Sequence, residues 1–383
     1  MQASRSLLAL SLFVGGVALM AADTADRPKA KAEKRIDFDR AKELFQKKKA
    51  GEKLTSDEDA YLQKAIESRR GKDARGAAQS GVKSGETIGL KPLNEMTADD
   101  RYKDEDGGLY GKGRNSPPEP HRQAAETELA KIQPLNAAGK RAKDGQIVFV
   151  SISMSNATQE FSTFKQKADA DPEKSSRVTI VDCAQGGQAM AEWVDPKGNP
   201  WREAERRIAA AKVTDQQVQV AWVKLANKAP HGDLQEHGKR LQRDTLAVLQ
   251  NAKARFPNLR IVYLASRIYG GYATGPLNPE PYAYESAFVC RWLIQDQIKG
   301  DPALNYDASR GEVKAPLLLW GAYLWADGTT PRKGDALVWQ LDDLDRDGTH
   351  PSRSGREKVA QLLLDFCKND SLAKSWFSKS GSR

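Results

Sequence analysis

Residues 147–158 read IVFVSISMSNAT, an apolar run followed by serines at alternate positions. The first four residues are β-branched or aromatic, which is typical of a short buried strand. If the strand continues, Ser151 and Ser153 point to one side, because side chains alternate along a strand. Ser155 then lies at the turn into the next helix. There its hydroxyl is exposed, and the helix N-terminus offers N–H groups to a developing negative charge.

Four further apolar runs have the same character. They are Val178–Val181, Val218–Val223, Ile261–Leu264 and Leu317–Trp320. Amphipathic stretches separate the runs, notably Ala204–Ala211, Leu234–Phe256, Glu285–Ile298 and Gly355–Phe366. Nearly continuous apolar strands that alternate with helices predict a parallel sheet covered on both faces. We therefore expect an α/β fold with a five-stranded parallel sheet in a three-layer α/β/α arrangement.

Polar or glycine residues follow the ends of the predicted strands. They are Gly186 and Gly187 after the second run, Lys224 and Asn227 after the third, Arg267 after the fourth, and Asp347 and His350 after the fifth. In open parallel sheets, ligands bind at the carboxyl ends of the strands. Paired glycines also let the backbone approach a ligand closely, although their commoner use is a plain turn. The sequence thus predicts a site at this edge of the sheet.

The segment DGTHPS at residues 347–352 contains one of the chain's four histidines. His350 has a carboxylate, Asp347, three residues before it, and a predicted helix start after it. Ser354 and Glu357 have the spacing of a capping box at that start. A carboxylate and an imidazole on one short loop can act as an orienting group and a general base. The alternative is a surface loop with an ordinary Asp and His.

These residues together resemble the SGNH, or GDSL-like, hydrolases over about residues 146–368. The resemblance rests on a serine after the first strand, a glycine after the second, a polar residue after the third, and Asp-x-x-His-Pro before the last helix. The segment around Trp222 is similar to the sialate and xylan acetylesterase branch. The resemblance implies a flavodoxin-like sheet and hydrolysis of esters, often acetyl groups on sugars. It implies neither a metal nor another cofactor.

The resemblance also implies roles for individual residues. By position, Ser155 matches the nucleophile, and Asp347 and His350 match the rest of the triad. Gly186 or Gly187 matches the oxyanion glycine, and Asn227 matches the oxyanion asparagine.

The sequence departs from the family pattern at two blocks. The Gly-Asp-Ser block is here Ser153-Met154-Ser155, so Ser153 competes with Ser155 for the nucleophile position. The Gly-x-Asn-Asp block is absent, so Lys224 competes with Asn227 as the third oxyanion donor. Arg267 either binds substrate or pairs with a structural carboxylate.

The N-terminus has the pattern of an export signal. Arg5 precedes an apolar run, Leu7–Met20, and Ala21-Ala22 follow it. This run has the length of a signal-peptide core and is too short to span a bilayer. We expect residues 1–22 to be a signal peptide of a secreted or periplasmic protein. An uncleaved anchor is the alternative.

Three further parts follow the predicted signal peptide. Residues 23–75 are basic and have helical periodicity, with a capping-box pair at Thr55 and Glu58, which predicts a helical hairpin. Residues 76–145 are rich in Gly, Pro, Lys and Asp and predict an irregular linker with a short helix at Gln123–Ile132. Residues 146–383 contain all five predicted strands and form the predicted hydrolase domain.

The net charge of +9 is not evidence for nucleic-acid binding, because much of the basic excess lies in the N-terminal third. We expect a small-molecule or polysaccharide ester as substrate, no nucleic-acid partner, and no membrane span in the mature chain. The oligomeric state stays open. Two function classes remain: a secreted serine esterase that hydrolyses acyl, above all acetyl, esters, and a non-catalytic relative that binds carbohydrate or a surface.

Overall fold

The computed structural model describes residues 40, 44, 47, 54–65 and 87–379. The chain divides into two compact units, Met1–Ser68 and Arg69–Arg383. The predicted signal peptide at residues 1–22 lies outside the described residues, as does most of the predicted first helix of the hairpin.

The first unit contains a helix over residues 56–65 that begins with the predicted capping box. Thr55 N donates to Glu58 Oε2 at 2.9 Å, and Glu58 N donates to Thr55 Oγ1 at 3.3 Å. Leu44, Leu62 and Ala65 form a small core. The capping-box prediction at Thr55 is therefore confirmed.

The second unit is built on a five-stranded, all-parallel sheet. Its strands are β1 (Ile147–Ser153), β2 (Val178–Val181), β3 (Val218–Lys224), β4 (Ile261–Leu264) and β5 (Leu317–Trp320). Their order is β2-β1-β3-β4-β5, and every neighbouring pair is parallel. This is the flavodoxin-like strand order. The predicted α/β fold class is confirmed.

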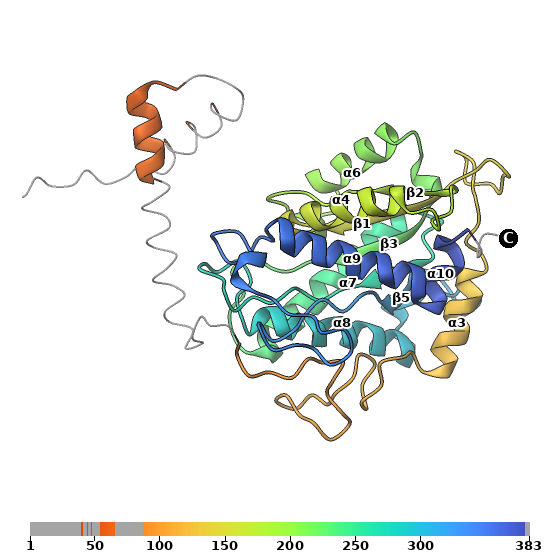
Figure 1. Ribbon diagram of the computed structural model, residues 1–383. Helices are drawn as coiled ribbons and strands as arrows, with labels where there is room; N and C mark the ends of the chain where they lie inside the picture. The colour runs from red at the N-terminus through yellow and green to blue at the C-terminus, as the bar shows by residue number, and fades with distance from the viewer. Residues whose placement is uncertain (1–39, 41–43, 45–46, 48–53, 66–86, 380–383) are drawn as a thin grey trace, which may run out of the picture. The chain divides into compact units, whose positions relative to one another are not determined.

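Helices cover both sides of the sheet, as Figure 1 shows. In chain order they are α3 (Glu119–Leu129), α4 (Ser155–Ala170), α5 (Met190–Val194), α6 (Asn199–Ala210), α7 (Lys239–Arg255), α8 (Tyr282–Lys299), α9 (Arg353–Asn369) and α10 (Ser371–Phe377). Helices α4 and α9 pack on each other, and α10 packs on α9, whereas α5, α7 and α8 pack in series. One turn of π-helix, Leu234–Gly238, leads directly into α7.

Helix α9 begins differently from the prediction. It starts at Arg353, and Ser352 is its N-cap residue without a side-chain cap. Ser354 Oγ instead donates to Asp342 O at 3.1 Å, and Glu357 accepts from Lys167 Nζ at 3.3 Å. The predicted capping box at Ser354 and Glu357 is wrong, because both side chains are bonded to other segments.

The core forms because both faces of the sheet are buried. Every residue of β1 is buried, including its serines. Aromatic rings join the layers: Phe161 of α4 stacks on Trp222 of β3 at 5.5 Å, and Phe149 of β1 meets Trp376 of α10 edge-on at 5.2 Å. Removing one such ring typically costs about 3–5 kcal/mol.

Residues 87–145 contain helix α3 and are otherwise mostly irregular, yet they pack on the unit that contains the sheet. Leu93, Leu109 and Tyr110 belong to the main core, and Trp320 Nε1 donates to Leu109 O at 2.6 Å. The Asp327 carboxylate accepts N–H bonds from residues 88 and 89, both at 2.8 Å. This segment therefore contributes to the fold rather than acting as a spacer. Its helix α3 begins and ends a few residues earlier than predicted.

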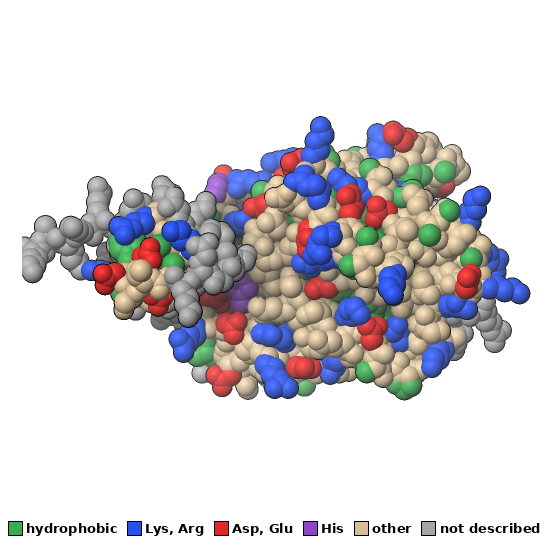
Figure 2. Space-filling model, turned by 90° about the horizontal axis from the view of Figure 1, so that it is seen from above, with side chains coloured by type: hydrophobic (Ala, Val, Ile, Leu, Met, Phe, Trp, Pro, Cys, Tyr) green, Lys and Arg blue, Asp and Glu red, His purple; other side chains and the backbone are tan. Residues whose placement is uncertain are grey.

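Charges of both signs are interspersed over the face of the molecule that Figure 2 shows. None of the helices among the described residues is long and apolar enough to cross a membrane.

Candidate active site

The structure brings Ser155, His350 and Asp347 into one hydrogen-bonded chain at the carboxyl edge of the sheet. Ser155 Oγ lies 2.7 Å from His350 Nε2, and His350 Nδ1 lies 2.5 Å from Asp347 Oδ2. The serine is the first residue of α4, and the histidine is 195 positions later, just before α9. The fold thus joins groups that have the geometry of nucleophile, base and orienting carboxylate.

The Asp347 carboxylate is held in its charged form. Its Oδ1 accepts the backbone N–H groups of Thr349 and His350, both at 2.9 Å. Burial would raise the pKa of Asp347, but the hydrogen bonds from His350 and Thr349 outweigh it and lower the pKa to about 2. An ionised carboxylate only accepts, so Nδ1 of His350 donates to it. In neutral His350, Nε2 is then left as the acceptor for the Ser155 hydroxyl.

Neither of the other two serines of this segment reaches His350. Ser151 Oγ donates to Asp182 Oδ1 at 2.6 Å, and Ser153 Oγ donates to the backbone oxygen of Lys224. Both serines are fully buried in β1. Of the three serines, only Ser155 thus lies at the start of the helix with its hydroxyl within hydrogen-bond distance of His350.

A cavity of about 210 Å³ lies against Ser155 and His350. Gly187, Asn227 and Arg267 line it, whereas Gly186 and Lys224 are not among its lining residues. Gly187 has φ +78°, a conformation that an L-residue rarely adopts. The Ser155 N–H has no intrahelical partner, because it belongs to the first turn of α4. Three residues with N–H groups, Ser155, Gly187 and Asn227, thus line one cavity.

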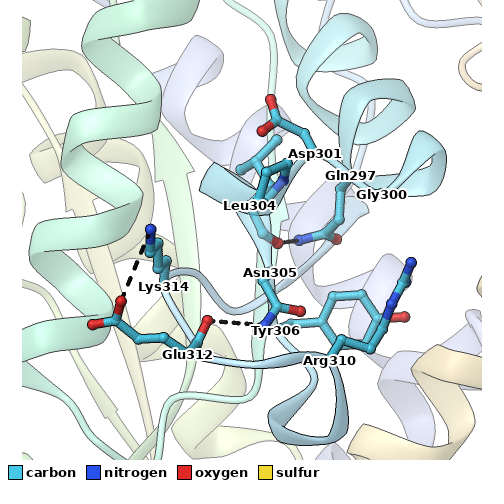
Figure 3. A pocket seen from close by; sticks show the side chains of 10 residues that line it. Gln297, Gly300, Asp301, Leu304, Asn305, Tyr306, Arg310, Glu312 and Lys314 are labelled. Carbon is cyan, nitrogen blue, oxygen red and sulfur yellow. Dashed lines mark hydrogen bonds and ion pairs between the residues drawn. The ribbon is translucent and has the colours of Figure 1, made fainter.

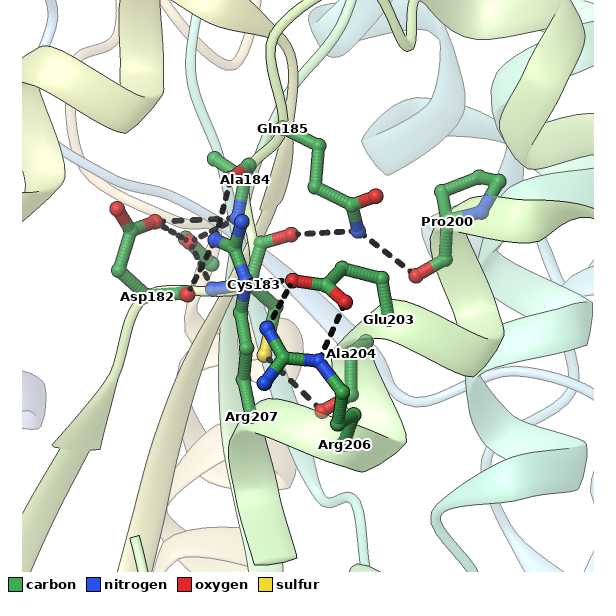
Figure 4. Close-up of polar contacts among 10 residues, drawn as sticks. Asp182, Cys183, Ala184, Gln185, Pro200, Glu203, Ala204, Arg206 and Arg207 are labelled. Carbon is green, nitrogen blue, oxygen red and sulfur yellow. Dashed lines mark hydrogen bonds and ion pairs between the residues drawn. The ribbon is translucent and has the colours of Figure 1, made fainter. Parts of the chain in front are cut away.

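The turn that carries Gly187 is fixed to β1 and to α6. Gln185 N donates to Ser153 O at 3.1 Å, and Arg207 Nη1 of α6 donates to Asp182 O at 3.0 Å and to Ala184 O at 2.8 Å. Figure 4 shows this network around Asp182 and Arg207. Burial raises the pKa of Asp182 to about 6, against the bonds from Ser151 and Ala184.

The structure separates the two candidates for the third donor. Asn227 Nδ2 donates to Asp244 Oδ2 at 3.1 Å, which holds the amide at the cavity wall. Lys224 is fully buried and pairs with Glu160 of α4, and burial lowers the pKa of Lys224 to about 8. Lys224 therefore lies in the interior beneath the helix, paired with Glu160, and Asn227 lines the cavity.

Sequence reasoning missed three residues that support this site: Asn156, Glu160 and Asp244. Asn156 Nδ2 donates to Thr349 O at 2.7 Å, joining the serine helix to the histidine loop. Glu160 and Asp244 hold Lys224 and Asn227. The sequence could have indicated Asn156, because it directly follows Ser155. The other two pairings depend on the tertiary fold.

A second cavity, of about 240 Å³, lies beyond the C-terminus of α8 (Figure 3). Two of its polar side chains donate to backbone oxygens of the loop: Gln297 Nε2 to Leu304 O at 2.9 Å, and Asn305 Nδ2 to Glu312 O at 2.8 Å. Gln297 Oε1 accepts from Leu318 N near the start of β5, so this cavity lies away from the carboxyl edge. In the described part of the chain, no cluster of three or more acidic, His or Cys side chains could hold a metal ion.

Comparison with known proteins gives structural neighbours only. No protein-family model and no curated protein matches the chain. One neighbour is a protein from Slackia heliotrinireducens that is described as an SGNH hydrolase. It is 16% identical, the match covers 58% of this chain and 99% of the neighbour, and the TM-score is 0.32. Another is a protein from Bacteroides fragilis NCTC 9343 that is described as an acylhydrolase. It is 14% identical, the match covers 66% of this chain and 96% of the neighbour, and the TM-score is 0.31.

The periplasmic domain of a lipopolysaccharide acetyltransferase from Salmonella ser. Paratyphi A has 13% identity, coverage of 66% and 97%, and a TM-score of 0.31. At these TM-scores the function of this chain has to be argued from its own site.

Proposed function

We propose that this protein is a serine ester hydrolase in which Ser155 is the nucleophile, His350 the general base and Asp347 the group that orients the imidazole. The observation that supports this proposal is the unbroken chain of contacts from Ser155 Oγ to His350 Nε2 at 2.7 Å and from His350 Nδ1 to Asp347 Oδ2 at 2.5 Å.

The reaction proceeds in two halves. Ser155 Oγ attacks the ester carbonyl carbon while His350 takes the hydroxyl proton. The resulting oxyanion lies against the N–H groups of Ser155 and Gly187 and the amide of Asn227. The bond to the leaving alcohol then breaks, and His350 returns the proton to the alcohol oxygen. Water then attacks the acyl–Ser155 ester while His350 takes its proton. The bond between the acyl carbon and Ser155 Oγ breaks, His350 returns the proton to Oγ, and the carboxylic acid leaves.

A short acyl group, above all acetyl, is the substrate that suits this site, because the cavity beside Ser155 is only about 210 Å³. The loop over residues 268–284, rich in Tyr, Gly and Pro, brings Leu277 to the cavity wall and suits a sugar as the alcohol part. The export pattern at residues 1–22 supports action outside the cytoplasm, on free or polymeric carbohydrate esters.

The test is hydrolysis of p-nitrophenyl acetate by the wild type, Ser155→Ala and a control variant, Ser162→Ala. Ser162 lies on the same helix, and its hydroxyl bonds only Gln159 O at 3.3 Å among the described residues. We expect Ser155→Ala to lose roughly a thousandfold or more in kcat, and Ser162→Ala to keep wild-type activity. If Ser155→Ala retains activity, the nucleophile assignment is wrong. A wild type inactive on all esters would favour the non-catalytic binding protein.

A further inference from the structure

Arg267 differs from the other buried arginines of the described chain. Arg267, Arg291 and Arg332 are 3%, 1% and 5% exposed. Arg291 pairs with Glu105 and Asp106, and Arg332 pairs with Asp335. Arg267 forms no ion pair with any described residue, and its Nε and Nη1 lack a hydrogen-bond partner there.

The charges around Arg267 do not cancel. Glu160 is fully buried, its Oε2 is bonded to Lys224, and its charge also acts on Arg267. Two buried cations thus share one buried carboxylate, which leaves an excess of one positive charge. Burial lowers the pKa of Arg267 to about 10, so the guanidinium is still charged at neutral pH. An unpaired buried charge is costly to a fold, and such costs are retained where they serve binding.

This excess charge faces the cavity beside the candidate triad. Arg267 lines the same cavity as Ser155 and His350, and no Asp or Glu is among the described residues that line it. The other cationic lining residue, Lys228, is exposed and already bonded to Glu192 and to Gly187 O. An anion in the cavity would lie beside the Arg267 guanidinium and offset its charge.

We propose that the ester substrate carries a carboxylate, and that Arg267 binds this carboxylate in the cavity beside Ser155. The inference rests on the proposed esterase function and narrows its substrate class to acidic esters, such as acyl esters of a sugar acid or esters of a dicarboxylic acid. A guanidinium recognises a planar carboxylate through charge-assisted hydrogen bonds that no neutral group replaces.

The catalytic test uses two matched pairs of esters. In the first pair, mono-p-nitrophenyl succinate carries a carboxylate on the acyl side and p-nitrophenyl butyrate is its neutral partner. In the second pair, 4-acetoxybenzoate carries a carboxylate on the alcohol side and 4-acetoxybenzamide is its neutral partner. We expect the charged member of one pair to have a kcat/KM roughly tenfold to a hundredfold higher in the wild type. Arg267→Met should remove that preference, measured as the ratio of kcat/KM for the charged ester to kcat/KM for its neutral partner. Equal or lower kcat/KM for the charged ester in both pairs would overturn the proposal.

A binding test separates failure of this inference from failure of the proposed function. The Tm of the Ser155→Ala variant is measured alone and in the presence of D-glucuronate, D-glucose or inorganic phosphate. A rise in Tm with glucuronate but not glucose, absent from the double variant Ser155→Ala/Arg267→Met, supports the carboxylate site even if no ester is hydrolysed. No rise with glucuronate, or a rise with phosphate alone, overturns it.

Stability distinguishes binding from a structural role of the arginine. Without ligand, Arg267→Met should have a Tm equal to or above that of the wild type, because it removes an unpaired buried charge. The matched control, Arg291→Met, should lower Tm, because it leaves Glu105 and Asp106 without their cation. If Arg267→Met lowers Tm as much as Arg291→Met, Arg267 is a structural partner of Glu160 and the proposal fails.

Discussion

The side-chain amide of Asn156 donates to the backbone oxygen of Thr349 at 2.7 Å, and both groups are buried. Asn156 follows Ser155, and Thr349 precedes His350. This one bond therefore ties the first turn of α4 to the loop before α9, and it sets the spacing between the proposed nucleophile and its base.

Replacing Asn156 by alanine should therefore reduce activity more than stability. We expect kcat on p-nitrophenyl acetate to fall roughly tenfold to a hundredfold, because small misplacements of reacting groups are costly in rate. The loss of stability should be about 1 kcal/mol. Asn251→Ala is the control, because its amide also donates to a backbone oxygen, Val194 O at 2.9 Å, away from the site. Equal kcat in the two variants would contradict this role.

Gly348 allows the histidine loop to pass the loop after β4. Its φ is +63°, and a Cβ there would lie 1.7 Å from Tyr272 O. Gly348→Ala should displace His350, lower kcat at least tenfold, and cost on the order of 1–3 kcal/mol of stability. Gly334→Ala is the matched control, since nothing lies within 4 Å of its added Cβ. A Gly348→Ala variant with wild-type rates would show that this close approach is not needed.

Asp182 should make stability depend on pH in a defined direction. Burial raises its pKa to about 6, whereas the unfolded chain has an ordinary value of about 4. Between these values the folded state binds more protons than the unfolded state, so this group lowers stability as pH rises from about 4 to about 6. Asp182→Asn keeps an oxygen for Ser151 and Ala184 and should flatten this part of a plot of Tm against pH. Parallel plots for the two proteins would contradict the shifted pKa.

The segment over residues 87–145 should be needed for stability. A chain beginning at residue 146 would expose the core surfaces that Leu93 and Leu109 cover, and it would leave Asp327 without its N–H donors at residues 88 and 89. We expect this fragment to have a lower Tm than one beginning at residue 87, or to be insoluble. Equal Tm values would support the domain boundary at residue 146 that the sequence predicted.

The strands were predictable where the chain changes abruptly from apolar to polar residues. Strands β2, β4 and β5 have the predicted bounds, because each is an isolated apolar run. Strands β1 and β3 extend further, through Ser153 and Lys224, because bonds to distant groups satisfy these polar side chains. Such partners cannot be inferred from local sequence.

The site was predictable as far as the carboxyl-edge rule applies. That rule, with the family resemblance, selected Ser155, Asp347 and His350, and the structure brings them together. The resemblance matched Asn227 to the third donor but left Lys224 as a competitor, because the two are only three residues apart. Which of the two lines the cavity depends on Glu160, which pairs with Lys224. That pairing follows from the packing of α4 on the sheet.

The most direct test of the central claim is labelling with a fluorophosphonate probe, followed by mass-spectrometric mapping of the modified residue. Such probes react with serines that are activated by a neighbouring base. The wild type should be labelled at Ser155 alone, and labelling should be lost in His350→Ala and strongly reduced in Asp347→Asn. Labelling at another residue, or equal labelling of Ser155 in His350→Ala, would contradict the proposed triad.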